Sequence, residues 1–288
     1  MKKRKQPFGQ NFLVDLDAAK KIVRLARVKK DGVVVEIGPG KGVLTHDLLP
    51  RTNRLIALEI DPHLCRDLKK KYGQLPNFEL QETDAQKTDY ASLAPKFQVV
   101  SNLPYCAATP IVKRLIHYRK YFDDMTLMLQ REVAARMTAR PGTREYGSLS
   151  LFVQYHCEAE RLLEVGRDCF YPKPKVESTV IRLVPRPLPP VAVGNEKNLF
   201  TLIHASFMHK RKTLRNNLKG VQGHFEVDLG VIEDMGIDLN RRAEDLSLAE
   251  FAGISSVLRR SRCTCPRFSC RCLHAGPRER PIRERALP

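Results

Sequence analysis

The chain has 288 residues, of which 42% are apolar, so it can bury at least one sizeable core and is not disordered throughout. Its 50 Lys and Arg against 32 Asp and Glu give a formal charge of +18, which indicates a polyanionic partner. No apolar run approaches the roughly 20 residues of a membrane helix, and no apolar segment follows the basic start MKKRKQPFGQNFL. We therefore expect a soluble cytoplasmic protein that has no membrane partner.

Short β-branched runs alternate with helix-like stretches from about Asp31 onward, which is the pattern of successive βα units. Strands are predicted at 33–38, 55–60, 78–85, 97–103, 125–130 and 176–184, and helices at 43–50, 64–73 and 131–140. This order predicts an α/β fold with a doubly wound, mostly parallel, Rossmann-like sheet.

A proline-rich stretch at 184–196 follows the last predicted strand and is typical of a linker. Beyond it, apolar residues from Leu199 to Leu218 recur at helical spacing, and Ser247 with Glu250 forms a capping box before another helix. Three parts are predicted: an α/β domain at 1–187, a small helical domain at 188–260, and a disordered tail at 261–288. Residues 259–288 hold nine Arg and two Glu, a net +7, which leaves +11 for residues 1–258.

A glycine-rich segment, Glu36-Ile37-Gly38-Pro39-Gly40-Lys41-Gly42, lies between the first predicted strand of this region and a helix. Glycines there allow a sharp turn and a close approach of a ligand to the backbone. Glu59 ends the next strand, where a carboxylate can accept both hydroxyls of a ribose, and Asp84 ends the third, where it can accept an adenine amino group. The three positions share one sheet edge and predict a nucleoside cofactor.

The spacing E-x-G-x-G-x-G differs from the G-x-G-x-x-G of nicotinamide dinucleotide sites. The leading Glu36, and the lack of an Arg partner for phosphate, favour a ligand that carries no phosphate.

The fourth predicted strand leads into Ser101-Asn102-Leu103-Pro104-Tyr105. The Asn102 side chain and the Pro104 carbonyl could accept hydrogens from the amino group of a planar heterocycle that stacks on Tyr105. This arrangement suits N-methylation by positioning and electrostatics, without a side-chain general base. The alternative interpretation is a plain turn, in which Asn102 caps the next helix and Tyr105 packs in the core.

Several of these motifs resemble known ones. E-x-G-x-G-x-G is similar to motif I of class I S-adenosylmethionine-dependent methyltransferases, and NLPY to motif IV of amino-group nucleic-acid methyltransferases. Further stretches resemble the ribosomal RNA adenine N6-dimethyltransferase family, in family order between residue 6 and about 258. They are QNFL at 10–13, LQREVAARMTARPGTREYGSLSLFVQ at 129–154, CFYPKPKV at 169–176 and the basic helix FMHKRKTLRNNL at 207–218.

The resemblance implies S-adenosylmethionine as cofactor and the following residue roles. Cofactor contacts are expected at Asn11, Leu13, Gly38, Glu59, Asp84 and Asn102. Handling of the target base is expected at Asn102, Leu103, Pro104, Tyr105 and Phe170, with Phe170 as a second aromatic wall. The chain departs from the family at Thr83, where glycine is frequent, and in the tail after Arg260.

RNA contacts are expected at a basic stretch that holds no acidic residue and includes Lys210, Arg211, Lys212 and Arg215. A solvated helix face is the alternative for such a run. The cysteines of RCTCPRFSCRC, at 263, 265, 270 and 272, could bind zinc, but a basic extension or an unselected sequence suits their spacing better, and no metal is predicted.

The resemblance implies dimethylation of two adjacent adenines near the 3′ end of small-subunit rRNA, within the pre-small ribosomal subunit, by a monomer. Two alternatives stay open: a large-subunit rRNA adenine methylase of the antibiotic-resistance type, which more often has isoleucine at the position of Leu103, and a nucleic-acid-binding transcription-factor relative.

Overall fold

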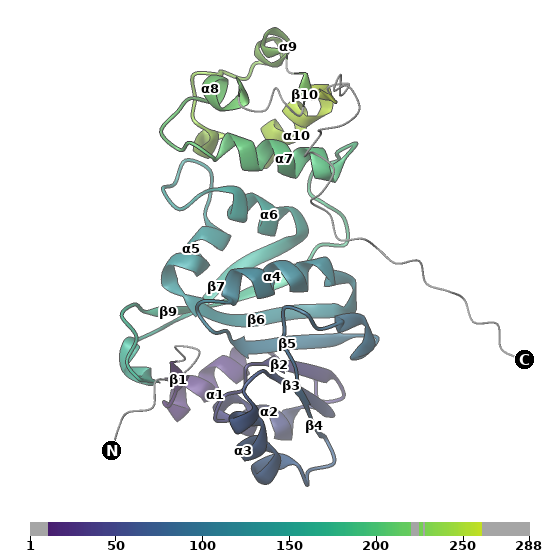
Figure 1. The fold of residues 1–288 in the computed structure, drawn as a ribbon, viewed down its shortest axis with the longest axis vertical. Helices are drawn as coiled ribbons and strands as arrows, with labels where there is room; N and C mark the ends of the chain where they lie inside the picture. The colour runs from purple at the N-terminus through teal and green to yellow at the C-terminus, as the bar shows by residue number, and fades with distance from the viewer. Residues whose placement is uncertain (1–10, 220–224, 227, 261–288) are drawn as a thin grey trace, which may run out of the picture.

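A seven-stranded central sheet organises the part of the chain that the structure, a computed structural model, describes: residues 11–219, 225–226 and 228–260 (Figure 1). The strand order is β4-β3-β2-β5-β6-β9-β7. The parallel strands are β4 (Phe78–Glu82), β3 (Arg54–Glu59), β2 (Val33–Ile37), β5 (Phe97–Asn102) and β6 (Phe122–Gln130). The antiparallel strands β9 (Ser178–Pro185) and β7 (Cys157–Val165) complete one side.

Helices cover both faces of this sheet, so the predicted doubly wound α/β fold is confirmed. Alternate residues of each strand point to opposite faces, which divides the apolar side chains into two cores. Val34, Leu55 and Val100 face α1 (Leu16–Leu25), α2 (Val43–Leu48) and α3 (Pro62–Tyr72). Val35, Ile56 and Val99 face α4 (Ala108–His117), α5 (Arg131–Thr138) and α6 (Ser148–His156).

A third core holds the C-terminal helices α7 (Glu196–Ser206), α8 (Leu214–Lys219), α9 (Leu229–Asp234) and α10 (Leu248–Val257), which Figure 1 shows stacked beyond α6. Tyr146, Leu151 and Tyr155, from the segment before the proline-rich stretch, are buried in the same core. A boundary at residue 187 therefore stays a prediction, because the apolar interior of the C-terminal helices continues into α6. The predicted capping box is confirmed: the Ser247 hydroxyl accepts from Glu250 N, and Glu250 Oε2 accepts from Ser247 N.

The basic stretch at 207–218 is not one helix, which corrects the expectation. Helix α7 ends at Ser206 and α8 begins at Leu214, so the residues between form turns. Leu199, Ile203, Leu214 and Leu218 are nevertheless buried together, since two short helices that meet at a turn can share an apolar side.

Within the described ranges, no helix is long and apolar enough to cross a membrane. The same residues contain no group of three or more His, Cys, Asp or Glu side chains that could hold a metal ion. The four cysteines of the tail lie outside the described residues.

Candidate active site

A cavity of about 260 Å³ lies where β2, β3 and β5 end at the carboxyl edge of the sheet. The carboxyl ends of parallel strands are the usual place for a ligand in such a fold, because the strand-to-helix turns open there. The cavity is lined by every residue predicted to contact the cofactor: Asn11, Leu13, Gly38, Glu59, Asp84 and Asn102. Leu103, Pro104 and Tyr105 line it as well.

The turn after β2 depends on its glycines. Gly38, Gly40 and Gly42 have φ of +64°, +59° and +77°, in the left-handed region that other residues rarely adopt. A Cβ at Gly40 would lie 3.0 Å from the Phe12 ring, and one at Gly42 would lie 2.8 Å from Tyr72. The sharp turn expected from the sequence is present, and the close approach of a ligand to its backbone stays a prediction.

Glu59, at the end of β3, is 2% exposed and organises the backbone around it. Its Oε2 accepts from Gly40 N at 3.1 Å, and its Oε1 accepts from Ile60 N at 2.9 Å and Asp61 N at 3.0 Å. Burial raises the pKa of Glu59, and the three N–H groups oppose that rise. The carboxyl group therefore joins the glycine turn to β3 while it lines the cavity.

Asp84 lies two residues beyond β4, on a turn that is stabilised by hydrogen bonds to the oxygens of Asp84 itself. Its Oδ1 accepts from Gln86 N at 2.9 Å, and its backbone carbonyl accepts from Lys87 N and Thr88 N. Thr83, the departure from the family pattern, adopts an ordinary backbone here, and its N–H donates to the Glu59 carbonyl at 2.8 Å.

Asn102 ends β5 with its side chain uncommitted among the described hydrogen bonds, and α4 begins at Ala108, with Ala107 as its N-cap and no side-chain cap. The interpretation of Asn102 as a helix cap is therefore wrong. Neighbouring contacts hold its backbone: Ser101 Oγ donates to the Ile37 carbonyl at 2.5 Å, and Leu103 N donates to the Met128 carbonyl at 3.1 Å. An unpaired, half-buried amide beside the cavity can accept a ligand's donor.

Tyr105 is half-buried, and its hydroxyl hydrogen-bonds to the buried Ser178 Oγ at 2.7 Å. Burial raises the pKa of this phenol, so it stays protonated. Ser178 begins β9 and was missed from the sequence, because a serine in a strand carries no signal of a distant partner. Through this contact, β9 sets the orientation of the ring that lines the cavity.

Replacing Ser178 with Ala is expected to lower kcat for methyl transfer by about 3- to 10-fold, the worth of one hydrogen bond, while cofactor affinity stays unchanged. Tyr105→Phe should lose a similar factor, and the double variant should lose no more than either single one. Steady-state kinetics and calorimetric titration of the three variants provide the measurement. Additive losses would show that Ser178 does not act through Tyr105.

Phe170 is the one predicted base-handling residue outside the cavity lining, although it pairs with Leu13, which lines the cavity. It belongs to the short strand β8 (Phe170–Tyr171), which pairs with β1 (Phe12–Leu13), and it is buried in the core that packs against α1. It is not part of the cavity lining. Its role as a second aromatic wall stays a prediction.

Glu36 is fully buried in β2, where its Oε2 accepts from Thr45 Oγ1 at 2.7 Å. Burial raises its pKa to about 8, and the nearby Glu59 adds to the rise. Apart from Glu36, Glu59 and Asp84, the only charged residue of the cavity lining is Lys41, whose Nζ lies 5.2 Å from the centre of the Phe12 ring. The cavity is acidic.

Glu36→Gln is expected to stabilise the protein at high pH but not at low pH. The folded protein keeps this carboxyl protonated up to about pH 8, whereas the unfolded chain ionises near 4.5. The stability that Glu36 contributes is complete below about pH 4.5 and is lost as the pH rises through 8. Melting temperatures should coincide near pH 4.5 and differ by several degrees at pH 8.5.

The exposed Glu82→Gln is the control for this experiment and should follow the wild type at every pH. A constant difference between Glu36→Gln and wild type across the range would contradict the buried, protonated carboxyl.

Phe12 and Ile60 are among the lining residues to which the sequence assigned no individual role. Phe12 lies against Gly40, and Ile60 is 44% exposed beside Glu59. The sequence signal for Ile60 is that a large apolar residue directly follows Glu59 at the predicted cofactor site. Such a side chain offers a surface on which a flat ring can pack.

Three of the predicted RNA contacts lie on the turn between α7 and α8, and the fourth lies in α8. Lys210, Arg211 and Lys212 are exposed on the turn, whereas Arg215 is half-buried and pairs with Glu233. The first three can meet a phosphate without losing a partner.

The doubly wound sheet and the acidic, glycine-lined cavity at its carboxyl edge define a Rossmann-like methyltransferase. A dimethyladenosine transferase from Plasmodium falciparum is similar in structure, with a TM-score of 0.72 and 29% identity over 84% of this chain and 95% of that one. The sequence profile described as ribosomal RNA adenine dimethylase matches residues 1–260. The chain belongs to this family.

Its relatives include the ribosomal RNA small subunit methyltransferases A of Clostridium perfringens and Geobacillus kaustophilus, each 42% identical. The matches cover 87% of this chain and 89% of the first relative, and 88% and 90% for the second. The 23S rRNA methyltransferase ErmE shares the fold, with a TM-score of 0.67 at 24% identity over 85% of this chain and 98% of that one.

Proposed function

We propose that the chain transfers methyl groups from S-adenosylmethionine to N6 of two adjacent adenines near the 3′ end of small-subunit rRNA. The relatives named for small-subunit rRNA methylation, and the family profile over residues 1–260, support this substrate. The main structural support for the proposed function is the side-chain amide of Asn102, which has no partner among the described hydrogen bonds. It lies at the end of β5, in the same cavity as Gly38 and Glu59.

The residues of the cavity fit S-adenosylmethionine. Glu59 and Asp84 suit a ligand with positive charge and ribose hydroxyls, and the lining holds no arginine for a phosphate. Gly38 and Gly40 leave the backbone accessible, and Ile60 offers an apolar surface for a ring. When bound, this cofactor supplies an electrophilic methyl group.

The chain's own residues would orient the target base. Adenine N6 is a poor nucleophile because its lone pair is delocalised into the ring. The Asn102 side-chain oxygen and the Pro104 carbonyl would accept its two hydrogens and direct the lone pair at the methyl group, while Tyr105 stacks on the ring. Pro104 O already accepts from Ala107 N at 3.0 Å, and its second lone pair serves the base. The released proton passes to water.

Such a base must leave its stack to reach the cavity, so the substrate presents the adenines in a loop or flips them out. The partner would be the pre-small ribosomal subunit, with exposed Lys210, Arg211 and Lys212 on RNA phosphates. Action as a monomer in the cytoplasm stays a prediction.

The test is methyl transfer with labelled S-adenosylmethionine to small subunits that lack the modification, followed by mapping of the product. Labelled dimethyladenine in small-subunit rRNA is the expected product. Labelling of large-subunit rRNA alone would replace this function with the large-subunit alternative, and nucleic-acid binding without any transfer would favour the transcription-factor alternative.

A further inference from the structure

A second hollow, of about 620 Å³, lies on the molecule away from the cofactor cavity. Five of its lining residues are cationic, and the only acidic one is Asp123. We call this hollow the basic groove. Its cations are Lys29, Lys96, Arg119, Lys120 and Arg186.

The basic groove is at the amino edge of the parallel strands, opposite the active site. Lys29 precedes β2, and Lys96 directly precedes β5. Arg119 and Lys120 lie in the short turn before β6, and Arg186 follows the antiparallel β9. The six residues of β5 lead from this edge to Asn102, a length of about 20 Å at 3.3 Å per residue. A group bound in the basic groove is therefore not the target adenine.

The cations of the basic groove outnumber the carboxylates that pair with them. Asp123 serves both Lys29, at 2.5 Å, and Lys96, at 3.8 Å. Arg186 pairs with Glu158, which leaves an excess of three positive charges.

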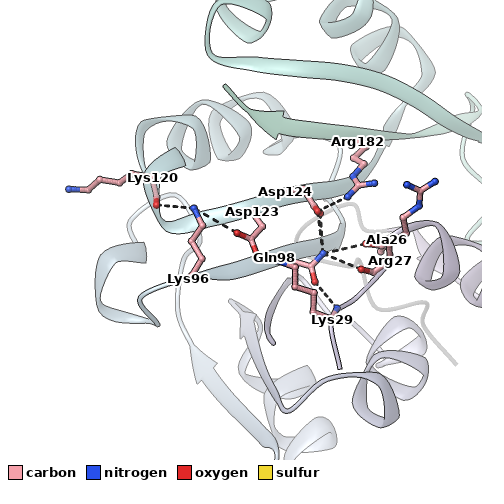
Figure 2. Close-up of polar contacts among 9 residues, drawn as sticks. All are labelled: Ala26, Arg27, Lys29, Lys96, Gln98, Lys120, Asp123, Asp124 and Arg182. Carbon is pink, nitrogen blue, oxygen red and sulfur yellow. Dashed lines mark hydrogen bonds and ion pairs between the residues drawn. The ribbon is translucent and has the colours of Figure 1, made fainter. Parts of the chain in front are cut away.

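Arg119 and Lys120 pair with no carboxylate among the described residues. Arg119 donates only to the Ile116 carbonyl, and Lys120 Nζ lies 4.9 Å from the centre of the Tyr121 ring. Figure 2 shows the Lys120 side chain directed away from Lys96 and Asp123. These two cations are available to an anion from outside.

Buried polar contacts lie next to residues of the basic groove in the chain, as Figure 2 shows. Gln98 Oε1 accepts from Lys29 N at 2.8 Å, and Gln98 Nε2 donates to Asp124 at 3.2 Å. Asp124, 5% exposed, also pairs with Arg182 at 2.7 Å. This network fixes the backbone of Lys29, one of the five cations, so less conformational entropy is lost there when a ligand binds.

We propose that the basic groove binds backbone phosphates of a second rRNA segment, distinct from the one that presents the target adenines. The inference rests on the proposed function, because the substrate at the opposite edge is then a folded RNA large enough to reach both edges. Cations from four separate segments suit a polyanion whose charges recur along its length, and they require no particular base.

The double variant Arg119→Gln/Lys120→Gln tests this surface. Lys69→Gln/Lys70→Gln is the matched control: it removes the same charge from two exposed positions in the last turn of α3. Filter binding to unmodified small subunits at a series of KCl concentrations gives log K against log[KCl]. Two lost phosphate contacts should make the slope shallower by about 1.4 to 1.8. The control should keep the wild-type slope, and both variants should keep wild-type melting temperature and S-adenosylmethionine affinity.

Protein-free small-subunit rRNA provides a second arm, on which the same change of slope is expected. A change on intact subunits but not on protein-free rRNA would overturn the proposal in favour of a ribosomal protein as partner, and an unchanged slope on both would overturn it outright. The wild-type methylation assay is read separately. If the wild type methylates small subunits but the double variant shows no change of slope, only the proposal for the basic groove is refuted. If the wild type fails to methylate them, the proposed function is refuted.

Discussion

Replacing Asn102 with Ala is expected to lower methyl transfer to small-subunit rRNA by at least about 100-fold while the protein remains folded. Removal of one group that stabilises a transition state typically costs 10²- to 10³-fold in rate. Asn102 fits that role because its amide is uncommitted and lines the cavity, while Ser101 and Leu103 hold the strand end without it. Single-turnover transfer from labelled S-adenosylmethionine measures the loss.

The control for Asn102 is Asn53→Ala, an exposed asparagine directly before β3, which should leave transfer unchanged. Thermal unfolding of both variants should match the wild type. Transfer by Asn102→Ala at more than about a tenth of the wild-type rate would remove Asn102 from the proposed site.

Replacing Glu59 with Gln is expected to weaken S-adenosylmethionine binding by about 100-fold. Both carboxylate oxygens accept backbone N–H groups, so an NH₂ in place of either oxygen would face a donor with another donor. Hydrogen bonds to charged groups are worth about 1.5–3 kcal/mol. The substitution would weaken the hydrogen bond that holds the Gly40 turn as well as the proposed contact with the ribose. Calorimetric titration of the cofactor measures the affinity.

Glu82→Gln is the matched control, because Glu82 pairs in register with Glu59 on the neighbouring strand β4 but is exposed. It should bind the cofactor as the wild type does. Wild-type affinity in Glu59→Gln would contradict both the donor clash and the role of Glu59 in holding the cofactor.

The sheet and its carboxyl edge were predictable because each signal there is local. Val33–Ile37 is a buried apolar run, and a glycine turn follows it directly, so strand and turn can be recognised without knowledge of the rest. Glu59 and Asp84 follow from the same rule, since parallel strands bring their ends to one edge. The resemblance supplied Asn11 and Leu13, for which no physical pattern exists in the sequence.

The parts that were not predicted depend on contacts between distant segments. Strand β7, with the pattern CEAERLLEV, is half-exposed and polar, so its apolar alternation is weak and only its pairing with β9 identifies it. Ser178 touches Tyr105 from 73 positions away. The basic groove brings together cations from four loops that are individually unremarkable in the sequence.

The shared core of α6 and the C-terminal helices also limits how this protein could be recombined with its relatives. Leu151 and Tyr155 are buried against Leu199, Leu202 and other residues beyond the proline-rich stretch. A chain cut there would present these side chains to water, at about 25 cal/mol for each Å² of apolar surface exposed. A C-terminal part from another member would have to match α6 side chain by side chain. Exchange of the C-terminal part alone would therefore leave apolar surface exposed unless the incoming helices packed against Leu151 and Tyr155.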